Sequence, residues 1–124
     1  MEKEKTKIRS FTDLNTWKEG HELVLIVYKA TEKFPQKESF GLISQARRCA
    51  VSITSNIAEG FSRNTAKEKS RFYSIAQGSL TELQNQLLIA RDVSYLSNEE
   101  FNVIAQQTVF VSKLLNGLKR MVQR

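Results

Sequence analysis

The sequence predicts an all-α protein folded as an antiparallel, up-down-up-down four-helix bundle. Its 124 residues include one proline and five glycines, so few positions interrupt a helix. Apolar residues recur at spacings of three and four, and no long stretch alternates as a half-buried strand does. Because 40% of the residues are hydrophobic, one core is expected. We predict a flexible, charged tail over residues 1–10 and a single domain over residues 11–124.

The first two predicted helices are separated by Pro35, which disfavours helical backbone at the residue before it. The first helix begins near Thr12 or Asp13, both good N-caps. Its predicted apolar stripe is Leu14, Trp17, His21, Val24, Tyr28 and Thr31. The second helix is predicted from about Ser39 to a stop at Gly60. Its apolar side carries Leu42, Ala46, Cys49, Ala50, Ile53 and Ile57.

The third helix is predicted from Asn64 or Thr65 to a point near Ser94–Tyr95. Its stripe is Phe72, Ala76, Leu80, Leu83, Leu87, Ala90 and Val93. The fourth opens with Ser97 and Glu100, the spacing of a capping box, and runs to about Val122. The short connections between helices predict antiparallel neighbours.

The fourth helix carries more apolar surface than one core needs. A first stripe comprises Phe101, Ile104, Thr108, Val111, Leu115, Leu118 and Val122. A second stripe, rotated by about 100°, comprises Val103, Phe110, Leu114 and Met121. Either both stripes serve one wide core groove, or the second stripe is an oligomer interface.

Polar residues line one face of the second helix at spacings of three and four. They are Gln45, Arg48, Ser52, Asn56 and Glu59, and Ser79 and Glu82 are their candidate partners on the third helix. Gly78 is expected to allow a close approach of the two helices. We interpret this set as a structural polar network that sets helix register. A ligand or nucleic-acid site on the same face is the alternative.

The segment Ser44-Gln45-Ala46-Arg47-Arg48, followed by Ser52 and Asn56-Ile57-Ala58-Glu59-Gly60, resembles a family of four-helix-bundle proteins. These proteins are encoded in intervening sequences of bacterial 23S rRNA genes. Further matching segments are Phe11 to Trp17, Tyr28 to Pro35, Glu38 to Leu42, Arg71-Phe72 and Ile75 to Leu83.

This resemblance implies a ring-like homopentamer. It also extends structurally to the accessory variability protein of diversity-generating retroelements. That protein associates with a reverse transcriptase and with nucleic acid. The partners implied for this chain are therefore its own copies, RNA or DNA, and a protein such as a reverse transcriptase.

The net charge of +6 makes a polyanionic partner a candidate. The candidate nucleic-acid-binding residues form two clusters: Arg63, Lys67, Lys69 and Arg71, and Lys113, Lys119, Arg120 and Arg124. In an antiparallel bundle, both clusters should lie at one end and form a basic rim. The alternative is that these cations complement helix dipoles and maintain solubility.

Aromatic residues beside the first basic cluster could stack on bases. Phe72 is expected in the core, however, which leaves only Tyr73 for exposure. Backbone-directed binding to phosphate is therefore favoured over recognition of a base sequence.

The chain offers few groups for catalysis, and we expect no enzyme activity, metal or cofactor. Because His21 is the only histidine and Cys49 the only cysteine, no zinc cluster of nitrogen and sulfur ligands can form. His21 is expected to pack in the core, and Cys49 to be a buried thiol in a reducing compartment. Glu59 and Glu82 are expected in a buried ion-pair network with Arg47 and Arg48.

We see no secretory leader and no stretch long and apolar enough for a membrane span. The expected protein is therefore cytoplasmic and non-enzymatic, and binds nucleic acid without strong sequence specificity. The alternative is a structural or protein-interaction oligomer with no nucleic-acid role.

Overall fold

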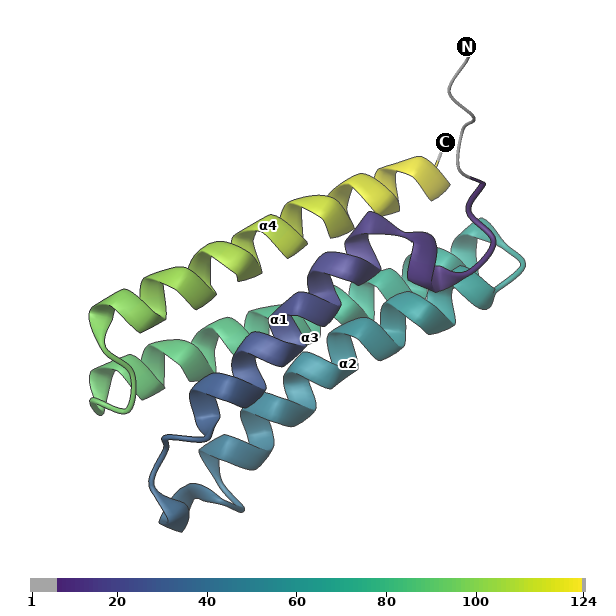
Figure 1. Cartoon of the computed structure of the whole chain (residues 1–124). Helices are drawn as coiled ribbons and strands as arrows, with labels where there is room; N and C mark the ends of the chain where they lie inside the picture. Colours follow the sequence, from purple (N-terminus) through teal and green to yellow (C-terminus); the bar gives the residue numbers. More distant parts are fainter. Residues whose placement is uncertain (1–6, 124) are drawn as a thin grey trace.

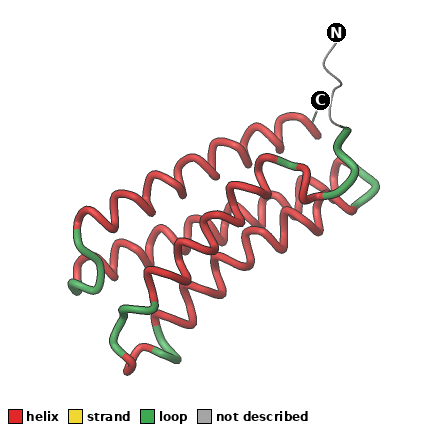
Figure 2. The backbone as a smooth tube through the Cα atoms, in the orientation of Figure 1, coloured by secondary structure: helices red, strands yellow, loops and turns green. Residues whose placement is uncertain are grey.

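In the computed structural model, which describes residues 7–123, the chain is all-α. The four long helices are α1 (Asn15–Thr31), α2 (Leu42–Ser62), α3 (Ala66–Asp92) and α4 (Asn98–Val122). Short 3-10 helices precede α1 (η1, Phe11–Asp13) and α2 (η2, Gln36–Glu38). Loops connect these helices, and no strand occurs in the described range (Figure 2). Most of the predicted tail lies outside the described residues, although Ser10 already caps η1.

The helices occupy the corners of an antiparallel bundle. Within residues 7–123, α1 contacts α2 and α4, and α3 contacts the same two helices, whereas diagonal pairs do not approach each other. The start of η1, the end of α4 and the α2–α3 connection lie at one end of the bundle, hereafter the terminal end (Figure 1). The α1–α2 and α3–α4 connections lie at the other end, hereafter the loop end. This is the predicted four-helix topology.

Side-chain caps fix the starts of the last two helices, as the sequence predicts. The Thr65 hydroxyl accepts the Glu68 N–H at the start of α3. Ser97 and Glu100 form the reciprocal capping box of α4. Each cap satisfies backbone N–H groups that a helix leaves unpaired.

The first two helices begin later than predicted. Asp13 accepts the backbone N–H groups of Arg9 and Ser10 and so stabilises the 3-10 turn before α1. These contacts lower the pKa of the half-buried Asp13 carboxyl. A second 3-10 turn and a non-helical backbone at Gly41 delay α2 to Leu42.

The buried face of α1 differs from the predicted stripe. Its buried residues are Thr16, Gly20, Leu23, Val24, Val27 and Thr31. His21 is exposed and stacks on the Trp17 ring at a centroid distance of 4.8 Å, so the predicted core histidine is wrong. The packing reason is Gly20, because a Cβ there would lie 3.1 Å from Thr54 Cγ2. Turning this small residue toward α2 brings the two helices close.

Gly60 and Tyr73 form the closest contact between α2 and α3 near the terminal end. The helix continues past Gly60 to Ser62, so the predicted stop at Gly60 is wrong. A Cβ at Gly60 would lie 2.6 Å from Tyr73 Cε1. Tyr73 is accordingly buried and Phe72 half-buried, the reverse of the prediction. Burial also raises the pKa of the Tyr73 phenol.

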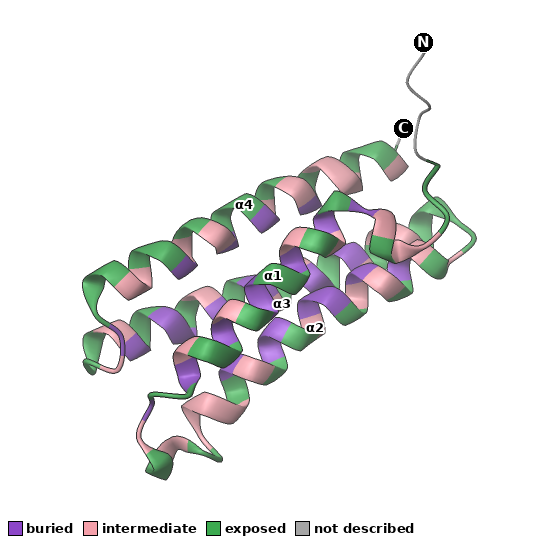
Figure 3. Cartoon of the chain, viewed as in Figure 1, coloured by how far each residue is buried: buried purple, intermediate pink, exposed green. Residues whose placement is uncertain are grey.

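The two stripes of α4 differ in burial in the single chain. Ile104, Thr108, Val111 and Leu115 of the first stripe are buried, as predicted. In the second stripe, Val103, Phe110 and Met121 are 61%, 46% and 64% exposed, while Leu114 is half-buried. Figure 3 shows the buried positions of α4 on the side toward the other helices. One core therefore uses one stripe, and the second remains on the surface.

Candidate nucleic-acid interface

The two helices that carry the predicted basic clusters meet at the terminal end. The start of α3 and the end of α4 enclose a shallow hollow of about 460 Å³. Its lining comprises Ala66, Lys67, Ser70, Arg71, Ser74, Val122 and Gln123. The Gln123 amide donates to the Ser70 hydroxyl across the two helices, at 3.2 Å. Hydroxyl, amide and cationic groups thus share one surface, a combination suited to phosphate.

Two of the predicted cations already have intramolecular partners. Arg63 pairs with Glu59 at 2.9 Å, and its guanidinium lies 4.6 Å from the centroid of the Phe72 ring. Lys69 donates to the carbonyl of Phe61 at 2.7 Å and so caps the end of α2. These two side chains would have to exchange partners in order to bind phosphate.

The other described cations of the clusters are available. Lys67, Arg71, Lys113 and Arg120 are exposed, and Lys119 is half-buried. None of them forms an ion pair within residues 7–123. Arg124 lies outside the described residues.

Ser70, Ser74 and Gln123 are members of this surface that the sequence analysis did not identify. Lys67, Ser70, Arg71 and Ser74 follow one another at helical spacing on α3. That polar periodicity was a readable signal for a shared face. Gln123 carried no comparable signal, because its contact with Ser70 depends on how α4 meets α3.

Positive charge is concentrated in the half of the bundle nearest the terminal end. The cations of that half are Lys7, Arg9, Lys18, Arg63, Lys67, Lys69, Arg71, Lys113, Lys119 and Arg120. Its carboxylates are Asp13, Glu19, Glu22, Glu59 and Glu68. Cations there clearly outnumber carboxylates among the described residues.

The half nearest the loop end is balanced. Its cations are Lys29, Lys33, Lys37, Arg47, Arg48 and Arg91. An equal set of carboxylates accompanies them: Glu32, Glu38, Glu82, Asp92, Glu99 and Glu100. The described chain is therefore electrically polar along its axis, with the excess positive charge at the terminal end.

The polar set between α2 and α3 forms only in part. The Ser52 and Ser79 hydroxyls lie 2.8 Å apart, and the Asn56 amide donates to the Ser52 carbonyl and hydroxyl. The two serines and Cys49 border a surface hollow of about 400 Å³, whose remaining lining is Gln45, Arg48, Glu82 and Gln86. A serine pair at the centre of the interface fits the predicted structural role.

Other members of the predicted polar set behave differently. Glu59 and Glu82 are exposed, so the predicted buried ion-pair network with Arg47 and Arg48 is wrong. Arg47 instead donates to the Thr31 hydroxyl at 2.9 Å and lies over the Tyr28 ring. Gly78 meets no atom within 4 Å of an added Cβ, so the expected close approach there is also wrong. The long side chain of Arg47 thus contacts residues of α1 that the spacing of residues along α2 could not identify.

Cys49 is the buried thiol that the sequence predicts. It donates to Glu82 Oε2 at 3.1 Å and accepts from the Gln86 amide at 3.4 Å. Burial, together with the contact to Glu82, raises the pKa of the Cys49 thiol to about 11. A protonated thiol is a poor nucleophile at neutral pH.

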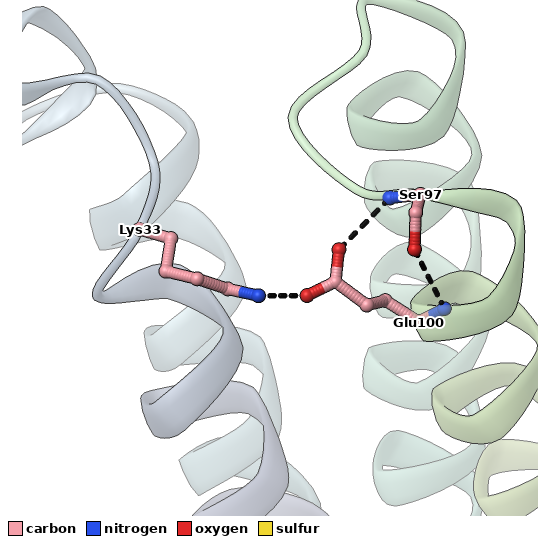
Figure 4. A network of polar contacts seen from close by, with 3 residues as sticks. All are labelled: Lys33, Ser97 and Glu100. Atoms are coloured by element: carbon pink, nitrogen blue, oxygen red, sulfur yellow. Dashed lines mark hydrogen bonds and ion pairs between the residues drawn. The ribbon is translucent and has the colours of Figure 1, made fainter.

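An apolar groove runs between α1 and α4 at the loop end. It has a volume of about 390 Å³ and is lined by Ile26, Lys29, Ala30, Glu32, Lys33, Glu100, Val103 and Ile104. Lys33 forms an ion pair with Glu100 across the two helices, and Glu100 also completes the Ser97 capping box (Figure 4). The groove therefore has an apolar floor and a charged rim.

Residues 7–123 contain neither a metal-binding cluster nor a membrane-spanning helix. No cluster of three or more His, Cys, Asp or Glu side chains is placed to hold a metal ion. None of the described helices combines the length and apolar character that crossing a membrane requires.

Comparison with known proteins identifies a family and a fold. Residues 12–117 match the family model described as "23S rRNA-intervening sequence protein". A crystal structure from Bacteroides thetaiotaomicron, of a protein with unknown function from the S23 ribosomal protein family, superposes with a TM-score of 0.77. The match covers 85% of this chain and 95% of that one, at 20% sequence identity. No curated protein shows detectable sequence similarity.

Proposed function

The chain belongs to the 23S rRNA-intervening sequence protein family, and from this premise we propose a function in binding nucleic acid. In this proposal the protein is a non-enzymatic homo-oligomer, a ring of five copies. It binds RNA or DNA through the terminal end of each bundle. The number five derives from the family resemblance, and the location of the binding surface derives from the charge of the chain.

The observation that carries the proposal is the concentration of positive charge at the terminal end. Lys67 and Arg71 flank a hollow that also contains hydroxyl groups. The N-terminus of α3 lies beside them, and its unpaired N–H groups favour anions. If copies assemble with parallel axes, their terminal ends form one rim, and their positive potentials add.

The available groups suit phosphate better than bases. Lysine and arginine contacts to phosphate position a nucleic acid but do not read its sequence. Tyr73, the predicted base-stacking residue, is 1% exposed and cannot stack on a base. The half-buried Phe72 is already covered on one face by Arg63. Binding with little sequence preference follows.

The reactive side chains of the chain support a non-enzymatic role. Cys49 is protonated at neutral pH because its pKa is about 11. His21 stacks on Trp17 at the surface, with no nucleophile paired to it among the described hydrogen bonds. Neither arrangement is an activated nucleophile and base.

Binding assays at varied salt test the proposal. We expect single- and double-stranded RNA and DNA all to bind, and the logarithm of the association constant to fall linearly with the logarithm of salt concentration. The double variant Lys67→Glu, Arg71→Glu should bind all sequences more weakly. For single strands its salt slope should be shallower by about 1.4, since each lost phosphate contact removes about 0.7.

The matched control is Lys37→Glu, Arg48→Glu. It changes net charge equally, and both of its sites are exposed in the half nearest the loop end. Its salt slope should stay close to that of the parent. Equal losses in both variants would mean that net charge alone matters and that the terminal end is not the interface.

Absence of binding at low salt would reject the nucleic-acid role. The alternative function would then be favoured. In it, the protein is a structural or protein-interaction oligomer whose positive end maintains solubility or binds an acidic protein. A reverse transcriptase is the protein partner that the family resemblance suggests.

A further inference from the structure

Phe40 is the most exposed large apolar side chain of the described chain. It is 99% exposed and lies in the connection between η2 and α2, at the loop end. A phenylalanine side chain left in water forgoes the favourable transfer that burial would provide. An aromatic side chain of this size and exposure is suited to burial against a partner surface.

The turn that carries Phe40 is braced on both sides. The Glu38 carboxylate accepts the Leu42 N–H at 3.1 Å and the Tyr95 hydroxyl at 2.9 Å. The Ser39 hydroxyl donates to the Gln36 carbonyl at 2.7 Å. These contacts fix the residues before and after Phe40, so the ring is held outward by a structured turn.

The α1–α4 groove supplies a surface of matching chemistry. Its floor consists of Ile26, Ala30, Val103 and Ile104, and its volume of about 390 Å³ is ample for one phenyl ring. Apolar walls around a single aromatic side chain are the usual form of an interface hot spot. The groove is open in the single chain, because Val103 is 61% exposed.

The groove and Phe40 lie at the same level of the bundle. Both are at the loop end, since the groove is formed by the last turns of α1 and the first turns of α4. Two copies placed side by side with parallel axes could therefore bring one ring to the neighbouring groove. Val103 also begins the second stripe of α4, so the groove is continuous with the predicted interface.

We propose that Phe40 of one copy inserts into the α1–α4 groove of the next copy. The ring and the groove are different surfaces, so the contact is heterologous, and repeated copies form a closed ring when the rotation between them closes. This inference rests on the homo-oligomer of the proposed function and adds the contact that joins its copies.

Cysteine cross-linking tests the contact. Phe40→Cys and Val103→Cys are made in separate chains that differ in size through a tag, and the chains are co-expressed and oxidised with copper phenanthroline. A mixed dimer is expected on a non-reducing gel. The parent chain is the blank, because its Cys49 is buried. The mass of each assembly is measured by light scattering before oxidation.

Two pairings are controls for this design. Phe40→Cys with Leu88→Cys offers another exposed site, 41% exposed against 61% for Val103, that lines a different groove, between α3 and α4, near the same end. Phe40→Cys alone tests a two-fold contact in which the rings of two copies meet. Neither pairing should cross-link appreciably.

The outcomes separate this inference from the proposed function. Oligomers that fail to cross-link Phe40→Cys to Val103→Cys, or that cross-link equally in a control pairing, overturn the contact and leave the assembly intact. A parent protein of monomer mass removes the assembly as well.

A second variant gives an independent readout. Phe40→Ala should raise the dissociation constant of the assembly by roughly 30-fold or more, as expected for a buried aromatic anchor. The melting temperature of the dissociated chain should not change, because the ring contacts nothing within its own bundle. An unchanged dissociation constant would overturn the inference.

Discussion

Gly60 and Gly78 lie on neighbouring helices with opposite surroundings. A Cβ at Gly60 would lie 2.6 Å and 2.9 Å from two ring atoms of Tyr73, whereas a Cβ at Gly78 would meet nothing within 4 Å. Tyr73 is 1% exposed and so has no room to move aside. Gly60 is therefore required by packing. Gly78 is exposed, and it stabilises the helix less than alanine would at the same position.

Gly60→Ala should lower the free energy of unfolding by roughly 1 to 3 kcal/mol, because the methyl group overpacks the α2–α3 contact. Gly78→Ala should raise it by up to about 1 kcal/mol, because alanine is the better helix former. Thermal unfolding followed by circular dichroism measures both. Equal or increased stability in Gly60→Ala would contradict the close contact with Tyr73.

At the level of elements, α4 has two apolar faces, one buried in the core and one exposed. Ile104, Val111 and Leu115 are at most 2% exposed and belong to the core. Val103, Phe110 and Met121 are largely exposed along the edge that borders α1. An apolar edge of this length on an otherwise charged protein is characteristic of a protein–protein interface.

Phe110→Glu should dissociate the assembly while leaving helicity unchanged, since an unpaired carboxylate in an apolar interface costs several kcal/mol. Light scattering should report about five times the 14.2 kDa chain mass for the parent and a smaller mass for the variant. Val109→Glu is the control, because Val109 is 47% exposed against 46% for Phe110 and projects from another side of α4. A monomeric parent, or equal dissociation by both variants, would count against the interface.

On the scale of the whole molecule, Glu38 links the two connections at the loop end of the bundle. Its carboxylate joins the α1–α2 connection to Tyr95 of the α3–α4 connection. The Leu42 N–H and the Tyr95 hydroxyl lower the pKa of Glu38 from its ordinary 4.5. The same contact raises the pKa of Tyr95. The folded state therefore binds the Glu38 proton less readily than the unfolded chain does.

A carboxyl with a lowered folded-state pKa stabilises the protein above its ordinary pKa, and that stabilisation is lost as pH falls through the folded-state value. The free energy of unfolding should thus decline between about pH 5 and about pH 3. Glu38→Gln should make the decline shallower, although Asp13, whose pKa is also lowered, retains part of it. Glu22→Gln, at an exposed carboxylate with no hydrogen bond in the described range, is the control. Identical pH profiles for the parent and Glu38→Gln would refute this role.

The elements of the bundle could be predicted from the sequence because helix formation depends on neighbours along the chain. The caps at Thr65 and Ser97 and the buried stripe of α4 appear as predicted. Alternating helix direction also places the start of α3 beside the end of α4. That the two basic clusters form one nucleic-acid surface stays a prediction.

Only the tertiary structure decided which face each helix turns inward and which side chains remain free. Adjacent residues point about 100° apart, so rotating a helix by part of a turn exchanges Phe72 for Tyr73, or His21 for Gly20, on the buried face. Gly20 and Gly60 set those rotations through contacts with Thr54 and Tyr73. Likewise, Lys69 and Arg63 have partners near the end of α2, whereas Lys67 and Arg71 form no ion pair within residues 7–123. Packing and competition for partners involve residues distant in sequence, and local spacing contains no record of them.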